Sequence, residues 1–293
     1  MNSGSPFVRQ VLQWSGSMLA LAGVVFVALQ LSAYSSELDF SFISGLSWVV
    51  IIGLALVYCF ANILLALAWW NLLKYFGSTA SKYRAIKVYG ISQLAKYVPG
   101  NIMHLAGRQA IGIASGIPGW PLAKSTIWEL ALIMIAGIFF SILVLPRYFP
   151  VISPVVASVT FLLALMTVIL VLSRYVSLAA ARALGYYVVF LTISGSVFVG
   201  LLSLVADEDS LGLTELSLLC GSFVVAWLAG LVTPGAPAGV GVRELILMLL
   251  LEEIVPEADL LMAVLLSRIV TVLGDVLFFL IALSLSGKCS SLK

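Results

Sequence analysis

The chain has 293 residues, of which 62% are hydrophobic and only 10% are charged, and its mean hydropathy is +1.17. A soluble globular domain contains about 45–50% apolar and 25% charged residues, so this composition excludes a soluble protein. It predicts one polytopic membrane domain over residues 1–293, with no stretch polar enough for a soluble enzyme domain. The formal net charge of +2 is small, but the distribution of the charges along the chain is informative.

Six apolar runs are long enough to cross a bilayer as α-helices. The hydrocarbon core is about 30 Å thick and needs roughly 20 helical residues. The first run is too long for the apolar core of a cleaved signal peptide and lacks a small-residue cleavage site, so we expect it to remain as a span. In chain order the runs are Val11 to Tyr34, Leu46 to Leu73, Trp120 to Leu145, Val151 to Leu172, Tyr186 to Ala206, and Leu260 to Leu285.

Two further apolar segments contain helix breakers, and we expect each to form a re-entrant helical hairpin. They cover residues 81–117 and 216–255, with breaks at Pro99-Gly100 and at Pro234-Gly235. Each half has about 15 residues and a length of roughly 22 Å, which is short for a full crossing. Non-helical backbone at membrane depth is tolerated only against protein or a water-filled cavity. The breaks therefore predict a polar cavity inside the bundle.

The two breaks are followed by the same sequence pattern. Arg108-Gln109 follows the first break, and Arg243-Glu244 follows the second at the same spacing. Broken helices at corresponding positions of two halves are the best sequence indication of a transporter binding site. The predicted fold is therefore an all-α polytopic helix bundle of about six full spans and two broken hairpins that are related as inverted repeats.

The charged residues segregate between the two sides of this predicted bundle. Cytoplasmic loops of membrane proteins carry an excess of Lys and Arg. With the N-terminus inside, Arg147 is the one basic residue that falls outside, together with the acidic stretches 207–215 and 252–259. We therefore expect a protein of the cytoplasmic (inner) membrane with both termini in the cytoplasm. The first hairpin would then enter from the cytoplasm and the second from outside.

The second hairpin contains the clearest candidate for a binding site. Gly239 and Gly241 precede a helix that should begin near Val242, and its free amide groups and positive dipole end would face the break. Arg243 lies in the first turn, and amide groups together with a guanidinium form an anion site suited to phosphate. Glu244 can pair with Arg243, cap the helix or carry a proton. The alternative is a tight helix crossing that needs glycine and an internal ion pair.

The first hairpin and the other charges in the apolar layer add candidates. A charge at a helix centre in the membrane costs about 2.5–3.5 kcal/mol, so each must face protein or water. His104 and Arg108 share a helix face, although His104 can equally be a hydrogen-bonded interior residue. Arg268 and Asp275 lie seven residues apart and either pair with each other or serve the function. The candidate substrate-binding residues are Arg243, Glu244, Gly239, Gly241, Pro99, Gly100, Asn101, His104, Arg108 and Glu129.

Several other chemistries lack the residues that they require. His104 is the only histidine, and Cys59, Cys220 and Cys289 have no metal-binding or redox spacing. The sequence has no Gly-rich loop of the kind that binds nucleotide phosphates. We therefore expect no metal, no cofactor, no enzymatic activity and no nucleic-acid partner.

Two motifs resemble those of a known family. Gln93 to Asn101, which reads QLAKYVPGN, and Ala238 to Glu244, which reads AGVGVRE, resemble the signature motifs of the flippase-like membrane region of lysylphosphatidylglycerol synthases. The resemblance covers nearly the whole chain and is to a stand-alone member without the synthase domain. In the bifunctional relatives, this region translocates an aminoacylated phospholipid. Stand-alone members are often linked to lipid-linked glycan assembly.

The resemblance and the predicted cavity together indicate a lipid translocase. It would move an anionic, glycan-modified or aminoacyl-modified headgroup of a membrane phospholipid or a polyprenyl-linked lipid. The alternatives are a non-transporting accessory subunit of a lipid-linked glycan or polysaccharide pathway and, less favoured, an integral-membrane transferase. Compatible protein partners are a glycosyltransferase, a lipid-modifying enzyme, or a second copy of the chain in a homodimer.

Overall fold

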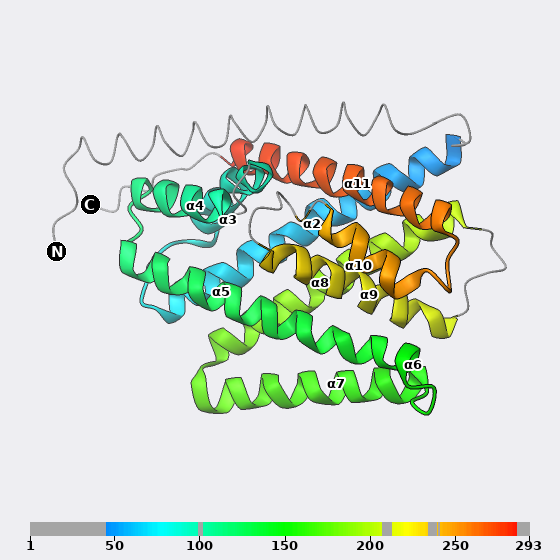
Figure 1. Cartoon of the computed structure of the whole chain (residues 1–293). Helices are drawn as coiled ribbons and strands as arrows, with labels where there is room; N and C mark the ends of the chain where they lie inside the picture. Colours follow the sequence, from blue (N-terminus) through cyan, green and yellow to red (C-terminus); the bar gives the residue numbers. More distant parts are fainter. Residues whose placement is uncertain (1–44, 99–101, 207–212, 234–238, 240, 286–293) are drawn as a thin grey trace.

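The described part of the chain is an all-α bundle, as the sequence predicts (Figure 1). A computed structural model describes residues 45–98, 102–206, 213–233, 239 and 241–285. Within these ranges the regular elements are α-helices and short 3-10 or π-helical segments. The predicted span at residues 11–34 lies outside the described residues, as do Pro99, Gly100, Asn101 and the break at Pro234-Gly235.

Six helices of the described chain are long and apolar enough to cross a membrane, which makes this a multi-pass membrane protein. Five of them coincide with predicted spans, and the sixth, α9, belongs to the second predicted hairpin. Two of the six have extensions: α5 continues through η3 (Ser141–Val144) into α6 (Leu145–Tyr148), and α7 continues into the π-helical η4 (Leu172–Val176). Their bounds are α2 (Gly45–Tyr75), α5 (Gly119–Phe140), α7 (Pro154–Val171), α8 (Leu178–Val205), α9 (Leu213–Val232) and α11 (Glu257–Ser284).

Serine caps determine where two of these helices begin. Ser153 accepts a hydrogen bond from the Val156 amide at the start of α7, and Pro154 occupies the first helical position, where no N–H donor is needed. Ser177 caps α8 through the Ala180 amide at 3.0 Å. Helix α8 therefore begins about two turns before the predicted span at Tyr186, and the added turns contain the exposed Arg182.

Both predicted hairpins are present as pairs of helices in contact, but the second is asymmetric. In the first, α3 (Lys82–Gln93) continues into η2 (Leu94–Tyr97), and α4 (Met103–Ala114) follows the break. In the second, α9 has 20 residues, or about 30 Å, whereas α10 (Val242–Leu251) has 10, or about 15 Å. The prediction of two halves of about 15 residues is wrong for this hairpin because α9 contains no proline and carries its single charge, Glu215, in its first turn.

The two helix pairs open toward opposite ends of the bundle (Figure 1). The pair α3–α4 lies at the end where α2 finishes and α5 begins, whereas α9 begins and α10 finishes at the end where α11 begins. At this second end Arg147, in α6, pairs with Glu253, just after α10. This arrangement agrees with the opposite entry directions that the charge distribution predicts. The inverted-repeat relation and the side of the membrane at each end stay predictions.

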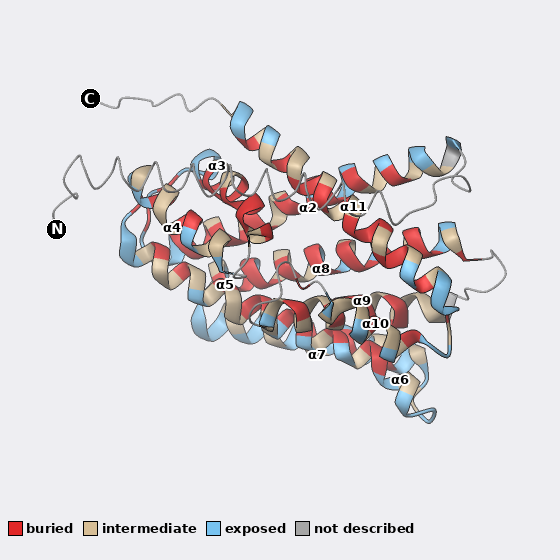
Figure 2. Ribbon diagram, turned by 45° about the horizontal axis from the view of Figure 1, so that its top comes forward, coloured by how far each residue is buried: buried red, intermediate tan, exposed pale blue. Residues whose placement is uncertain are grey.

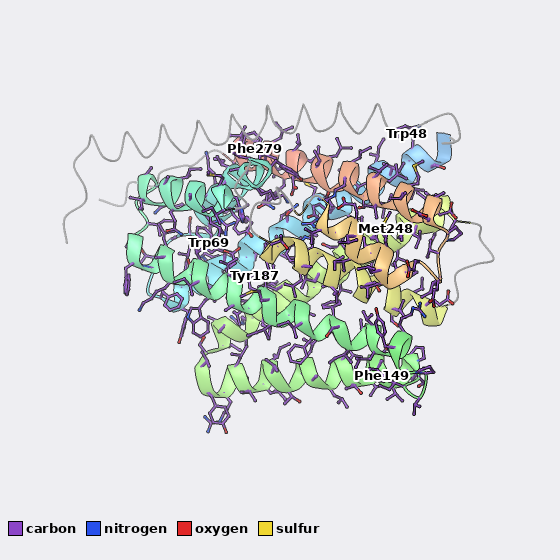
Figure 3. All side chains as sticks on the ribbon, viewed as in Figure 1. Trp48, Trp69, Phe149, Tyr187, Met248 and Phe279 are labelled. Carbon is purple, nitrogen blue, oxygen red and sulfur yellow. The ribbon has the colours of Figure 1, made fainter. Side chains whose placement is uncertain are left out.

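The core lies along α2, α8 and α11, which each bury one face, seen as red segments of the ribbon in Figure 2. Large side chains fill this interior: Trp69 and Tyr187 are both 0% exposed and lie near the centre of the bundle (Figure 3). Helix α7 is different, because only Ala157, Phe161 and Leu165 are buried along its length. In a membrane its remaining apolar side chains would contact lipid.

Sidedness can be tested by cysteine labelling. In a chain without its native cysteines, Ser210→Cys should react with a membrane-impermeant maleimide added outside intact cells, and Lys82→Cys should react only after permeabilisation. Cytoplasmic loops carry an excess of Lys and Arg, so the basic segment at Lys82 should lie in the cytoplasm and the acidic stretch around Ser210 outside. The reverse labelling pattern would refute this topology.

Candidate functional site

A cavity lies between the two helix pairs and the long helices that surround them. It contains about 910 Å³ of space between atoms, part of it open to the surroundings. Apolar and aromatic side chains form much of its wall. Ionisable side chains reach it from α2, α3, η2, α4, α5, α10 and α11. Those ionisable residues are Tyr58, Tyr89, Lys96, Tyr97, His104, Glu129, Arg243 and Arg268. The combination of an apolar wall and a few convergent polar groups is typical of a ligand site.

Arg108 and Glu129 form a buried ion pair in the wall of this cavity. Arg108 Nη1 lies 2.5 Å from Glu129 Oε2, and the two side chains are 1% and 6% exposed. The Tyr89 hydroxyl donates to the other Glu129 oxygen at 2.8 Å, and the Arg108 guanidinium lies 3.7 Å from the centre of the Tyr89 ring. Glu129 lines the cavity, whereas Arg108 lies behind it. Both carboxylate oxygens of Glu129 therefore already accept a hydrogen bond within the protein, one from Arg108 and one from Tyr89.

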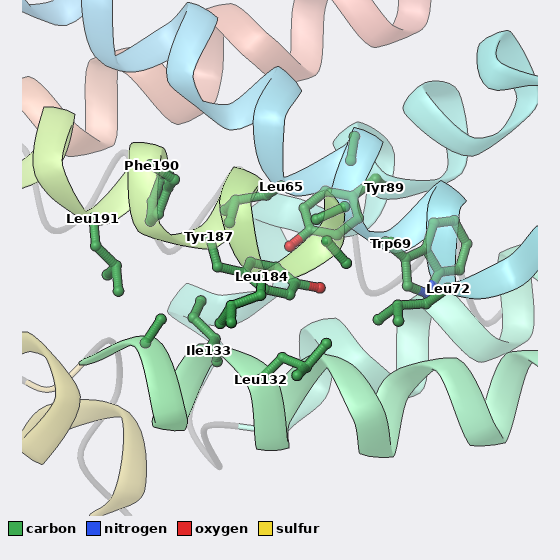
Figure 4. Close-up of a cluster of buried hydrophobic side chains, with 14 of the residues drawn as sticks. Leu65, Trp69, Leu72, Tyr89, Leu132, Ile133, Leu184, Tyr187, Phe190 and Leu191 are labelled. Atoms are coloured by element: carbon green, nitrogen blue, oxygen red, sulfur yellow. The ribbon is translucent and has the colours of Figure 1, made fainter. Parts of the chain in front are cut away.

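The ion pair is enclosed by packed aromatic and aliphatic side chains. Figure 4 shows Tyr89 and Tyr187 close together in this cluster, with Leu65, Trp69 and Leu132 around them. Charges attract each other more strongly where water is excluded. The Arg108–Glu129 pair therefore holds α4 against α5 and fixes one side of the cavity.

A second ion pair connects α10 to α11. Arg268 Nη2 lies 2.8 Å from Glu244 Oε1 and also donates to the Gly239 carbonyl at 3.1 Å. The possible Glu244–Arg243 pair is not formed, because adjacent residues on a helix do not face each other. The possible Arg268–Asp275 pair is not formed either, since seven residues separate the two along α11 by about 10 Å.

Asp275 instead belongs to a buried polar cluster beside the cavity, and it is 0% exposed. Its carboxylate accepts hydrogen bonds from Tyr97 at 2.5 Å, Asn62 at 3.1 Å and Gln93 at 3.4 Å, and the Lys96 ammonium lies 2.6 Å away. The sequence indicates Asp275 only as a possible partner of Arg268 or a functional charge, and it does not predict this cluster. The available signals are the single acidic residue in the apolar run Leu260 to Leu285 and the motif that begins at Gln93.

Arg243 differs from the other cations of the cavity because it has no acidic partner among the described residues. Its Nε is buried without a hydrogen-bond partner there, and its guanidinium lies 5.7 Å from the centre of the Trp227 ring. Lys96 and Arg268, which also line the cavity, are each paired with a carboxylate. The uncompensated positive charge of the described site is therefore that of Arg243.

Gly239 and Gly241 both lie just before Arg243 in the sequence, but only Gly239 lies against its side chain. Gly239 has a φ of +74°, and a Cβ there would lie 2.8 Å from Arg243 Nε and 2.9 Å from the Gly230 Cα. Gly241, at the start of α10, has a φ of +83° but open space around its missing Cβ. A close approach of the backbone is thus present at Gly239, whereas Gly241 is required only for its backbone conformation.

We expect alanine at these two glycines to have different effects. Gly239→Ala should displace the Arg243 guanidinium and abolish most of the transport activity that the sequence predicts, because the added Cβ would lie too close to its Nε. Gly241→Ala should cost about 1–2 kcal/mol of stability through left-handed backbone strain, with a smaller loss of activity. Transport rates and thermal unfolding of both variants measure the difference. Equal transport by the two variants would contradict the role of the close approach at Gly239.

His104 lines the cavity from α4, on the side of the first hairpin. Its Nδ1 is buried and has no hydrogen-bond partner among the described residues. This nitrogen therefore does not behave as that of a satisfied interior histidine. The neighbouring candidates Pro99, Gly100 and Asn101 lie outside the described residues.

Comparison with known proteins does not identify a family: no family model matches the chain, and neither curated proteins nor solved structures give a match. The resemblance of the two motifs to the lysylphosphatidylglycerol synthase membrane region therefore rests on those residues alone. Among the described residues, no group of three His, Cys, Asp or Glu side chains is arranged to hold a metal ion.

Proposed function

We propose that this protein is a lipid translocase that passes a phosphate-bearing headgroup through the cavity while the lipid chains stay in the bilayer. The observation that carries the proposal is the guanidinium of Arg243, which faces the cavity without an acidic partner among the described residues. An unbalanced charge inside an apolar bundle marks a functional site by default.

The charge balance of the cavity favours an anionic headgroup. Each acidic group at or beside the cavity already has a cation, since Glu129 pairs with Arg108, Asp275 with Lys96 and Glu244 with Arg268. A cationic headgroup would find no carboxylate without a cation among these three, and the one oxygen without a hydrogen-bond partner, Glu244 Oε2, belongs to a carboxylate that Arg268 already neutralises. A phosphate offers oxygens that match the planar fork of a guanidinium, which makes it the natural partner of Arg243.

The repeated sequence pattern supports the same conclusion. Arg243 occupies the place after the second break that Arg108 occupies after the first. Arg108 is neutralised by Glu129 from the helix that follows its hairpin, α5. The helix that follows the second hairpin is α11, and it contributes Arg268. Because Arg268 pairs with Glu244, Arg243 is left without a carboxylate. The counter-charge that the protein supplies in the first repeat would be supplied by the substrate in the second.

Purified protein in liposomes tests this proposal. The liposomes contain a fluorescent phosphatidylglycerol, and dithionite added outside quenches the molecules in the outer leaflet. We expect wild-type protein to move the fluorescent lipid from the inner to the outer leaflet, so that dithionite also quenches it. In protein-free liposomes the lipid of the inner leaflet should stay protected. Arg243→Gln should lose this activity, while Arg174→Gln, which removes an exposed arginine beside α7, should retain it. Absence of flipping by the wild-type protein, together with a co-purifying glycosyltransferase, would favour the accessory-subunit alternative and refute the translocase.

A further inference from the structure

Among the described residues, the buried cluster around Asp275 depends on a single cation, Lys96, for its charge balance. Its four donors come from three elements, with Asn62 on α2, Gln93 on α3, and Lys96 and Tyr97 on η2. Of these, Lys96 alone is positively charged. Other ionisable groups interact electrostatically with the cluster: Asp275 interacts with Tyr58 and Cys59 of α2, and Lys96 interacts with Arg243 of α10 and Arg268 of α11.

Lys96 belongs to the cluster and to the cavity at once. Its ammonium lies 2.6 Å from Asp275, yet its side chain is 21% exposed and lines the same cavity as Arg243. Asp275, by contrast, is fully buried. A phosphate group held by Arg243 would therefore compete with Asp275 for the Lys96 ammonium. A lysine suits such an exchange, because its charge is carried on a flexible stem with freely rotating donors.

Transfer of Lys96 to a phosphate would leave Asp275 as a buried carboxylate without a counter-ion. An isolated buried carboxylate is so unfavourable that it takes up a proton and becomes neutral. The protonated acid fits the same pocket, because its O–H can donate to the Tyr97 hydroxyl oxygen, which then directs its own proton elsewhere. The negative charge of the bound phosphate would thus be matched by one proton.

We propose that Asp275 is a proton-binding site that is coupled through Lys96 to anion binding in the cavity. One proton enters from water when a phosphate-bearing headgroup binds and leaves when the headgroup is released. This inference rests on the proposed function because it requires a phosphate-bearing ligand at Arg243. It goes further in that it couples lipid transport to the proton gradient.

Calorimetric titration of the purified protein tests the proton site. The probe is dihexanoyl-phosphatidylglycerol, a phosphodiester that keeps one negative charge near neutral pH. Titrations in buffers with different ionisation enthalpies give the number of protons taken up on binding, and we expect about one for the wild type. Asp275→Asn should take up none. The matched control is Glu257→Gln, which removes an exposed carboxylate at the start of the same helix and should behave as the wild type.

A second variant keeps the test decisive if Asp275→Asn does not fold. Lys96→Met leaves Asp275 with its three uncharged donors and no counter-ion, so the carboxyl group should already be protonated before the probe arrives. Binding should then be weaker and proton uptake absent. Wild-type levels of proton uptake in either variant would overturn the assignment.

The remaining outcomes separate the two proposals. Probe binding that requires Arg243 but takes up no proton in the wild type would overturn the proton site and leave the proposed function intact. Absence of any binding that depends on Arg243 would overturn the proposed function and the linked proton site with it.

Discussion

Arg243→Lys is expected to lose most lipid transport even though it keeps the positive charge. A guanidinium presents two parallel N–H donors to a phosphate, whereas an ammonium acts as a compact point charge. Hydrogen bonds between charged groups contribute about 1.5–3 kcal/mol each, so the affinity for an anionic headgroup should fall roughly 10- to 100-fold. The measurements are the dissociation constant of dihexanoyl-phosphatidylglycerol and the initial rate of flipping in liposomes, with Arg174→Lys as the control.

A double substitution decides whether Arg243 acts on substrate or within the protein. Glu244 pairs with Arg268 and not with Arg243, so Arg243→Gln combined with Glu244→Gln should remain inactive. Restoration of transport in the double variant would instead show that Arg243 and Glu244 form a structural ion bridge in the working protein. That result would refute the assignment of Arg243 to a phosphate site.

Glu129→Ala is expected to cause the largest loss of stability among the variants considered. It leaves the Arg108 guanidinium, which is 1% exposed, without its carboxylate. Breaking a buried ion pair by removing one partner costs about 3–5 kcal/mol, because an uncompensated charge remains buried. Reversible unfolding in mixed micelles of a mild and a denaturing detergent measures the free energy of unfolding.

Two further variants serve as comparisons for Glu129→Ala. Arg108→Met combined with Glu129→Leu removes both charges and keeps similar volumes, so it should recover most of the lost stability. Glu257→Gln removes an exposed carboxylate and should change the free energy of unfolding little. A Glu129→Ala variant as stable as the wild type would mean that the pair contributes nothing to folding.

The sequence by itself determines the class of this protein and the position of most of its described helices. Apolar runs of sufficient length are a local property, and five of the predicted spans coincide with helices of the structure. A pair of helices in contact is also present on either side of each predicted break, whereas their re-entrant character stays a prediction. Prediction is less accurate where a local cap extends a helix beyond its apolar run, as Ser177 does for α8.

Some features of the candidate site also follow from the sequence, and others do not. The sequence indicates Arg243, Glu129 and His104, which line the cavity, because ionisable residues and helix breakers are costly in an apolar layer. It offers Glu244 as a possible partner of Arg243, a pair that the structure does not contain, and it names no partner for Glu129. Glu129 pairs with Arg108 and Glu244 with Arg268, while Lys96 reaches Asp275 from a helix pair that is remote in sequence.

Only the tertiary structure decides these pairings. An ion pair forms between side chains that face each other across helices, and the facing depends on how the helices rotate and cross when their apolar surfaces pack. Spacing along one helix does not supply that information: Arg243 and Glu244 are adjacent in sequence and point in different directions, and Arg268 and Asp275 share a helix but are too far apart. The charge left unbalanced at Arg243 is a property of the packed bundle, and it is the basis of the proposed function.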